Sequence, residues 1–600
     1  MVKYMRSMLS KESRVSKHLE MMESMPQEKG DRGREEGKKG AANSMKWIYI
    51  LLIYILIAGC TLLWCFSFDV LRLKGQLVSV IPWFLEVNFL LIVVGAGLSI
   101  RGIREVFKGL TKKQWTLALS TALLGVILAM FVAPRVHRIF YDENIYLNIG
   151  QTIAAQKKAA MCAEGYNSYG QYRCIQLEHN KQPYAYPHVI SIIYRIFGYS
   201  ETAGFILNNL LFGAAVFTSF LIGWLLFGNF LAGISSSLLY CLIPENIIWA
   251  NTTAVETSAA LFAGLAMASA LIYIRRKGVG SLLLTAILMS YAAQFRVESL
   301  FVFPLVFLLL FLYNRATLKR ASFYWILALA LALLMPHFVQ LYAVRGESWG
   351  SAGDRMGLSF FLHNLSTNSV FYVNDTRFPL LFTLLLFLGV FWKDDGKARA
   401  FLGTWLLLFW GVFLLFYAGS YDYGQDVRFS VVSYMPLALL SGKGLANLLE
   451  RFRANEKGVA VQSIVLMAIL FCFTSFMPHI RTVGEEACQA RADHFYAKRM
   501  IKHIPENAMV LTHNPNMFLL WGKNAAQAAI ATNDHTAMNH FFERYTGGIF
   551  FHHNYWCNTD DPREQASCRN VLEKYRHSVI VEYSEKGYRF ILYRIEKKLS

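Results

Sequence analysis

The sequence predicts an all-α polytopic membrane protein with a small α+β domain at its C-terminal end. Hydrophobic residues make up 55% of the 600 residues, charged residues only 16%, and the mean hydropathy is +0.34. Soluble domains carry about 25% charged residues. About thirteen apolar runs approach the roughly 20 residues that a helix needs to cross a bilayer. The short alternating strands typical of a membrane barrel do not occur in these runs.

The apolar runs define a predicted transmembrane domain, 47–478. Its spans are expected near 47–68, 77–100, 115–133, 203–227, 229–245, 255–274, 281–295, 300–313, 322–343, 378–392, 400–418, 429–447 and 458–477. Residues 1–46 are polar and mildly basic and contain no apolar core. They therefore predict a disordered cytoplasmic tail and not a signal peptide.

Lys and Arg are concentrated in alternate loops, and this distribution predicts how the chain is oriented in the membrane. The formal net charge is +19, but the basic residues lie in short clusters between apolar runs. That pattern is typical of cytoplasmic loops and argues against a nucleic-acid partner. The loops expected in the cytoplasm are 101–113, 275–277, 315–320, 393–399 and 451–457. The N-terminus is then cytoplasmic and the C-terminus extracytoplasmic.

The longest predicted outer loop, 134–202, is too long for a simple connection. Residues 142–158 and 186–198 have helical patterns, and we expect both to lie along the membrane surface, the second ending at Gly198. Residues 479–600 are polar, and β-branched and aromatic residues are frequent in 578–583 and 588–593. This region predicts a soluble domain outside the membrane.

The nine cysteines fall into two groups. Four lie inside apolar runs and are expected to be packing residues: Cys60, Cys65, Cys241 and Cys472. Cys162 and Cys174 share the long outer loop, and Cys488, Cys557 and Cys568 belong to the C-terminal region. In an oxidising compartment, Cys162–Cys174 and Cys557–Cys568 could form disulfides, and free thiols are the alternative. No spacing of Cys and His indicates a structural zinc site.

Two adjacent carboxylates, Asp142 and Glu143, follow the third apolar run. A charge at the edge of a membrane span is costly unless it is solvated, paired or used. On a helix, neighbouring side chains point about 100° apart, whereas Asp142 and Tyr146 lie on one face. We therefore expect Asp142 to face a reaction centre, with Tyr146 beside it and Glu143 as a catalytic helper. The alternative is an acidic first turn that only stabilises the helix dipole.

The same outer loop contains a cation, aromatic residues and prolines in the segment 179–187. Lys181 could bind a phosphate, and Tyr184 or Tyr186 could pack against a sugar. A proline-stiffened loop with interfacial aromatic residues is the structural alternative.

Two arginines, Arg296 and Arg428, are expected on the outer side, against the charge bias, so each needs a partner. Guanidinium groups match phosphate geometry well, and a lipid phosphate is one candidate. Nearby carboxylates are the other: Asp422 or Asp426 for Arg428, and Glu298 for Arg296. Glu256 opens a later span, and we expect it to support the site or the acceptor. Further outward cations are Arg135, Arg138, Arg345, Arg355 and Arg377.

These features together resemble the GT-C class of membrane glycosyltransferases, especially the protein O-mannosyltransferase and lipid A aminoarabinose transferase group. The resemblance is carried in order by 141–146, by Gln182-Pro183-Tyr184 through Gly198, by Pro244 with Glu256, by 296–298 and by 426–429. It covers roughly residues 115–450. Two spans precede the usual first span, the group often has His-Pro-Pro where this chain has Gln-Pro-Tyr, and the C-terminal domain has no counterpart.

The resemblance implies an extracytoplasmic active site, a polyprenyl-phosphate-linked sugar as donor, and inversion at the anomeric carbon, with Asp142 as catalytic base. The donor-binding candidates are Lys181, Tyr184, Tyr186, Arg296 and Arg428. The acceptor, a glycan, lipid or protein, stays open. No cofactor is expected; a divalent metal could replace part of the arginine charge, but no outer carboxylate cluster indicates one.

Two other functions fit the sequence less well. An oligosaccharyltransferase or polysaccharide ligase would move a whole glycan, and the domain 479–600 could bind a large acceptor. A transporter or flippase for a lipid-linked solute would place ionisable residues in the middle of spans. Here nearly all ionisable residues lie at span ends or in loops, which disfavours transport.

Overall fold

The computed structural model describes residues 31–139, 141–168, 170–347, 351, 353–374, 377–391, 395–422, 426–453, 458–485 and 488–598. The chain divides into two compact units, Met1–Ala58 and Gly59–Ser600. Helix α2 (Asp31–Ser67) begins in the first unit. Residues 31–46 of the predicted tail are therefore helical, and residues 1–30 lie outside the described residues.

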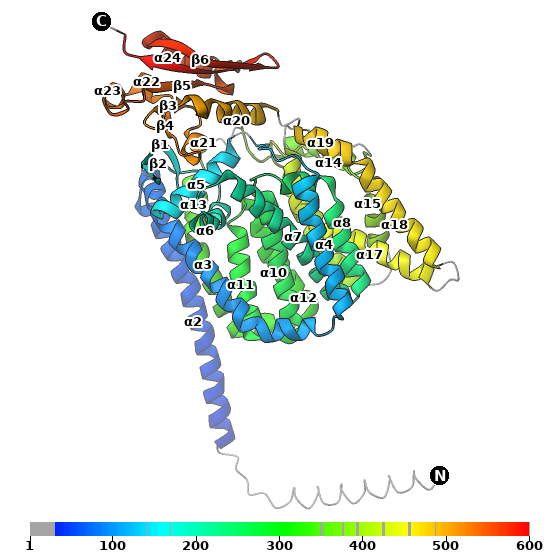
Figure 1. Ribbon diagram of the computed structural model, residues 1–600. Coiled ribbons are helices and arrows are strands. Elements are labelled where there is room, and N and C mark those ends of the chain that lie inside the picture. Colours follow the sequence, from blue (N-terminus) through cyan, green and yellow to red (C-terminus); the bar gives the residue numbers. More distant parts are fainter. Residues whose placement is uncertain are drawn as a thin grey trace, which may run out of the picture. The chain divides into compact units, whose positions relative to one another are not determined.

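Helices make up most of the second unit (Figure 1). The membrane part contains α3 (Val70–Phe107), α4 (Lys112–Phe131), α7 (Glu201–Phe227), α8 (Phe230–Leu242), α9 (Pro244–Ala250), α10 (Glu256–Arg276), α11 (Val279–Ala293), α12 (Val302–Tyr313), α13 (Ala321–Ala343), α14 (Phe361–Phe371), α15 (Leu380–Phe391), α16 (Gly396–Leu414), α17 (Tyr434–Arg453), α18 (Gly458–Ser475) and α19 (Met477–Glu485). Short 3-10 turns, η1 (Val297–Phe301) and η4 (Asp426–Ser433), precede α12 and α17.

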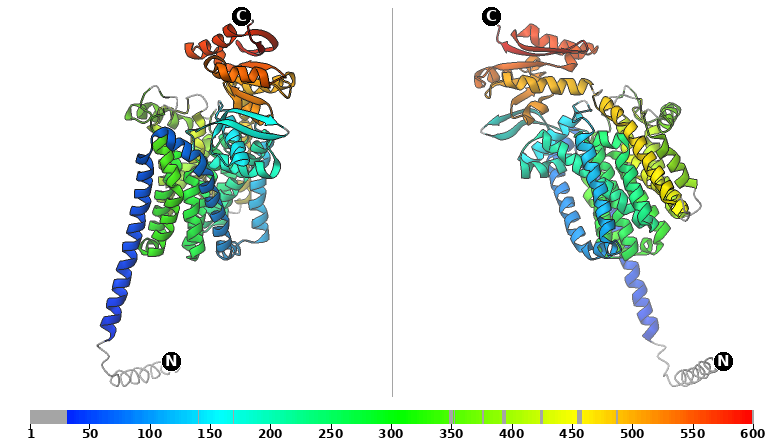
Figure 2. Two further views of the ribbon diagram at one scale, coloured as in Figure 1. Left: turned by 90° about the vertical axis from the view of Figure 1, so that its left-hand side faces the viewer. Right: turned by 45° about the vertical axis from the view of Figure 1, so that its right-hand side comes forward.

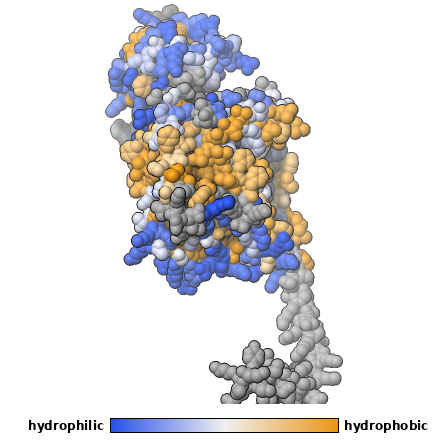
Figure 3. Space-filling view, turned by 90° about the vertical axis from the view of Figure 1, so that its right-hand side faces the viewer, coloured by the Kyte–Doolittle hydropathy of each residue, from blue (hydrophilic) through white to orange (hydrophobic). Residues whose placement is uncertain are grey.

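Each predicted span falls on an apolar helix. Among the described residues, nine helices are long and apolar enough to cross a membrane. Helices α8 and α9 pass the same test as a pair bent by 65°, and three shorter apolar helices account for the remaining predicted spans. Apolar residues gather over the helical part, between hydrophilic residues at its far end and on the sheet domain (Figure 3). The chain is therefore a multi-pass integral membrane protein, as predicted.

The long outer loop folds as two helices and a hairpin. Helices α5 (Asp142–Gln156) and α6 (Ala185–Phe197) lie where surface helices were predicted. Between them, β1 (Met161–Ser168) and β2 (Gln171–Glu178) form an antiparallel hairpin closed by the Cys162–Cys174 disulfide. Helix α7 approaches α5 closely: a Cβ at Gly204 would lie 2.7 Å from a methyl group of Leu147.

The C-terminal region forms a sheet domain at one end of the bundle (Figure 2). Its strands are β3 (Met509–Thr512), β4 (Asn524–Gln527), β5 (Ile549–His553), β6 (Arg576–Glu585) and β7 (Tyr588–Glu596). Helices α20 (Cys488–Met500), α21 (Pro515–Leu520), α22 (Ile530–Asn533), α23 (His535–Arg544) and α24 (Pro562–Lys574) cover it. The second predicted disulfide, Cys557–Cys568, is formed here.

The sheet does not belong to the C-terminal region alone. Its order is β2-β1-β4-β3-β5-β7-β6, so the hairpin of the outer loop supplies two of the seven strands. Strands β4, β3 and β5 are parallel, and β1 pairs antiparallel with β4. Successive residues of β3 serve opposite faces, since Val510 packs in one core and Met509 and Leu511 in the other. The hairpin cysteines belong to the first of these cores.

Candidate active site

Helix α5 begins at the predicted acidic pair. Tyr141 precedes it in the left-handed conformation, with φ 55° and ψ −28°. Asp142 and Tyr146, four residues apart, both line one cavity, as their helical spacing predicts. Glu143 points elsewhere and is completely buried, whereas 28% of the Asp142 side chain is exposed.

The cavity has a volume of about 720 Å³ and is lined by both charged and apolar side chains. Its charged residues are Asp142, Lys181, Glu256, Arg296, Glu298, Arg355 and Arg428. Its apolar wall comes chiefly from η1, from the end of α16 and from the residues that follow α16; it includes Val297, Leu300, Phe301, Val412, Phe413 and Phe416. Four cationic side chains face three carboxylates, so the cavity has a formal charge of +1 before any ligand enters.

Two guanidinium groups pair with the carboxylates of the cavity. Arg296 Nη1 lies 2.5 Å from Glu256 Oε1, and Arg296 Nε also pairs with Glu298. Arg428 lies 3.8 Å from both Asp142 Oδ2 and Glu256 Oε1. Both guanidinium carbons lie 5.0 Å from the centre of the Phe429 ring, which holds the two cations beside each other. Each arginine thus has carboxylate partners close to it.

Burial raises the pKa of Asp142, and the nearby Glu143 charge raises it further. The cations Arg428, Lys181 and Arg296 lower it but do not cancel the effect of burial, so the pKa stays above its ordinary value. Such a carboxylate is a stronger base than one exposed to water.

Glu143 is held by a closed set of donors. It accepts hydrogen bonds from the backbone N–H groups of Arg138 (2.6 Å), Ile139 (2.9 Å) and Thr253 (2.7 Å), and from the Thr253 hydroxyl (3.0 Å). His137 Nδ1 lies 3.0 Å from Glu143 Oε2. Burial raises the pKa of Glu143, but His137 and the N–H groups outweigh it, and the pKa lies below its ordinary value. Burial lowers the pKa of His137, yet Glu143 and Glu201 raise it to about 9.

This arrangement differs from the expected helper role of Glu143. The side chain does not line the cavity, and its oxygens bind the loop that leads to Asp142. Its ionised form therefore fixes backbone geometry next to Asp142.

The other predicted residues separate into two groups. Lys181 lines the cavity. Tyr184 and Tyr186 do not line it: the Tyr184 hydroxyl bonds to the backbone of Asn180 within its own loop, and Tyr186 packs edge-on against Tyr146. Asp426 begins η4, but its side chain lies outside the described part of the chain.

Several site residues escaped the sequence prediction. Arg355 and the wall residues Leu300, Phe301, Val412, Phe413 and Phe416 lie in segments that carry no motif. Glu256 Oε2 is buried and accepts no hydrogen bond from the described residues, so it can accept one from a ligand. No pattern in the sequence distinguishes Arg355 from other loop arginines.

Two groups of side chains have the spacing of metal ligands within the described residues. The ligand atoms of His137, Glu201 and His494 lie within 4.8 Å of one another, as do those of His513 and the disulfide cysteines Cys557 and Cys568. The first group is already joined by hydrogen bonds of 3.1 and 2.7 Å to Glu201. The second offers no thiolate. The expectation that the reaction uses no metal stays a prediction.

The fold and cavity define a multi-pass membrane protein with an amphiphilic binding site beside an α/β domain. No protein-family model and no curated protein sequence matches the chain. Among solved structures, ArnT from Cupriavidus metallidurans bound to undecaprenyl phosphate is 14% identical, with a TM-score of 0.46 over 80% of this chain and 98% of that chain. The Archaeoglobus fulgidus oligosaccharyltransferase tethered with an acceptor peptide is 11% identical, with a TM-score of 0.46 over 81% and 74%.

A third structure is AglB from Archaeoglobus fulgidus with an inhibitory peptide and a dolichol-phosphate, 12% identical, with a TM-score of 0.44 over 80% of this chain and 74% of that chain. At these identities and TM-scores the similarity is distant.

Proposed function

We propose that the protein is an inverting membrane glycosyltransferase that moves a sugar from a polyprenyl-phosphate donor to an acceptor on the extracytoplasmic side. One observation carries the proposal: a single cavity joins a carboxylate–guanidinium cluster to an apolar wall. A lipid-linked sugar phosphate has the same two halves. Its single phosphodiester charge balances the formal charge of the cavity.

Each residue of the cavity has its own role in the proposed sugar transfer. The Asp142 carboxylate takes the proton from the acceptor, and the acceptor atom forms the new bond to the anomeric carbon as the bond to the phosphate oxygen breaks. The proton stays on Asp142, and polyprenyl phosphate leaves as an anion. Arg428, Arg296 and Lys181 stabilise that anion, which therefore needs no proton from the protein. Glu256 Oε2 accepts a hydrogen bond from the sugar.

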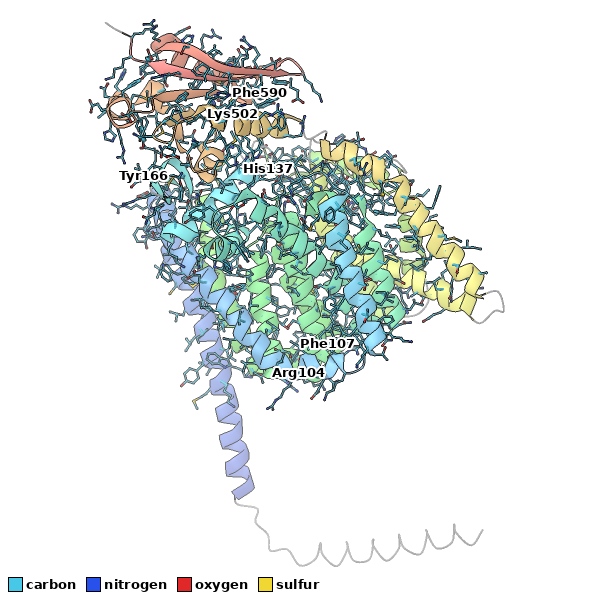
Figure 4. The ribbon with its side chains drawn as sticks, viewed as in Figure 1. Arg104, Phe107, His137, Tyr166, Lys502 and Phe590 are labelled. Atoms are coloured by element: carbon cyan, nitrogen blue, oxygen red, sulfur yellow. A yellow bond between two sulfur atoms is a disulfide. The ribbon has the colours of Figure 1, made fainter. Side chains whose placement is uncertain are left out.

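The charge distribution supports the proposed orientation. Arg104, in a loop expected in the cytoplasm, lies at the end of the bundle away from the sheet domain, whereas His137 lies next to that domain (Figure 4). The cavity, both disulfides and the C-terminus would then be extracytoplasmic, and the N-terminus cytoplasmic. An oxidising compartment agrees with two formed disulfides.

The decisive experiment replaces the base. We expect Asp142→Asn to lower sugar transfer about 10²–10⁴-fold, because the amide cannot accept the proton, while the protein stays inserted and folded. The exposed Asp560→Asn is the matched control and keeps full activity. The donor for this assay is the lipid extract of a deletion strain, in which the unused polyprenyl-phosphate sugar accumulates. Normal transfer by Asp142→Asn would remove Asp142 from the mechanism.

The product distinguishes the proposal from its alternatives. Mass analysis should find one sugar added to the acceptor; a transferred oligosaccharide would instead indicate an oligosaccharyltransferase or ligase. Solute transport by the purified protein in liposomes, without any sugar transfer, would indicate a transporter.

A further inference from the structure

The residue that precedes the proposed base has an unusual backbone conformation. Tyr141 has a φ of 55° although it is not glycine. Such a conformation is unfavourable for a residue with a side chain and persists only where the surroundings enforce it.

The sheet domain holds Tyr141 through helix α20. The Tyr141 hydroxyl donates a 2.9 Å hydrogen bond to Asp493 Oδ2, and Asp493 is completely buried. The other oxygen, Oδ1, accepts a 3.3 Å bond from the Tyr555 backbone N–H. The Tyr141 ring also lies 6.1 Å from that of Trp556. Asp493 is therefore fixed within its own domain while it binds the loop.

The next residue of α20, His494, is linked to Glu143 through two other side chains. His494 Nε2 lies 2.7 Å from Glu201 Oε1, which lies 3.1 Å from His137 Nε2. His137 in turn contacts Glu143, the residue after Asp142. Lys498 and Trp521 of the sheet domain donate to the other oxygen of Glu201, at 3.0 and 3.1 Å.

We propose that helix α20 positions the general base: Asp493 holds Tyr141 directly, and His494 is linked to Glu143 through Glu201 and His137. This inference rests on the proposed function. Asp493, His494 and Tyr141 are positioning residues and do not line the cavity. A displacement of the base by about 1 Å can lower the rate about 10²-fold. The sheet domain, which fixes the position of this loop, therefore controls the rate of sugar transfer although it does not line the cavity.

The attachment of the sheet domain does not depend on the Tyr141 bond. Strand β1 pairs with β4, and the hairpin cysteines share a core with Leu519 and Phe518. The Asn167 backbone N–H donates a 2.9 Å bond to Asn524 Oδ1. Removing the single hydroxyl of Tyr141 should thus leave the domain in place and change only the loop.

The test compares three variants of this contact in the purified full-length protein, with the deletion-strain lipid extract as donor. Tyr141→Phe removes the donor, Asp493→Leu removes the acceptor, and Asp493→Asn keeps an oxygen that accepts. We expect the first two to lower kcat about tenfold or more with an unchanged KM for the donor, and Asp493→Asn to retain most of the rate. The double variant Tyr141→Phe/Asp493→Leu should be no slower than either single variant.

A second readout follows the loop itself. Hydrogen exchange measured by mass spectrometry should become faster in residues 139–147 of Tyr141→Phe and stay unchanged in β1 and β4. Tyr575→Phe is the matched control, because its hydroxyl is also buried in the sheet domain but donates to Ala531 O, at 2.8 Å. It should keep the wild-type rate.

Three results would overturn the inference: full activity of Tyr141→Phe, an Asp493→Asn variant as slow as Asp493→Leu, or single effects that multiply in the double variant. Failure of the proposed function is a separate result. If Asp142→Asn is inactive and Tyr141→Phe is fully active, only the positioning role falls; if Asp142→Asn is active, the base assignment falls.

Discussion

Asp142 and Glu143 are neighbours in the chain, yet they belong to two different regions of the molecule. Asp142 lines an amphiphilic cavity, is partly exposed and has a raised pKa. Glu143 lies in a closed network with His137, Thr253 and backbone N–H groups, and its pKa is lowered. The comparison teaches that hydrogen-bond donors decide what each of two equal charges can do. Glu143, which accepts hydrogen bonds from several donors, supports the fold. Asp142, which has fewer such partners, is left available for chemistry.

The largest effect is expected at the buried member of the pair. Glu143→Gln keeps the volume but leaves the His137 imidazolium without one of its two carboxylates, and we expect a loss of about 3 kcal/mol in stability. Thermal unfolding in detergent measures it as a lowered Tm. Glu105→Gln, in an exposed pair with Arg276, is the control and should change stability by less than about 1 kcal/mol. Equal effects of the two substitutions would contradict the buried network.

The next effect concerns the cation that faces Asp142. Arg428→Gln should slow transfer about 10²-fold, because a charge that stabilises the leaving phosphate is lost. It should also move the acid limb of the pH profile of kcat/KM to higher pH. Arg428 lowers the pKa of Asp142, so its removal raises that pKa, and the active deprotonated form is lost at a higher pH. Arg428→Lys keeps the charge and should shift the acid limb less. An unshifted acid limb in Arg428→Gln would show that Arg428 does not lower the pKa of the base.

The smallest effect is expected at the apolar wall of the cavity. Phe301→Ala should raise the KM for the long-chain donor about fivefold, the equivalent of about 1 kcal/mol of lost apolar contact. The effect should disappear with a donor analogue that carries a short prenyl chain. Phe471→Ala, 77% exposed on α18, is the matched control. Equal sensitivity of long and short donors would mean that the apolar wall does not hold the lipid.

Much of the architecture could be predicted from the sequence, because membrane spans are local. The hydropathy of residues 115–133 alone predicts a helix there, and α4 covers Lys112–Phe131. The pairing of Asp142 with Tyr146 follows from helical spacing. Strands 578–583 and 588–593 were found by composition and fall in β6 and β7.

Other features of the site could not be predicted in this way. Tyr184 and Tyr186 have the composition of a sugar-binding loop, but the structure buries them away from the cavity. Glu201, Asp493 and His494 carry no motif, and their roles arise from contacts between segments that lie hundreds of residues apart.

By itself, the sequence determined the membrane class, the helices and the side chains that can carry charge at the membrane edge, since hydropathy and helical period act over short stretches of chain. Only the tertiary structure decided which of those side chains meet. It placed Arg296, Arg428 and Glu256 around Asp142, closed Glu143 into a network, and added the β1–β2 hairpin to one edge of the C-terminal sheet. Electrostatic and hydrogen-bonding energies depend on distance in space, and that distance is fixed by the packing of the whole bundle.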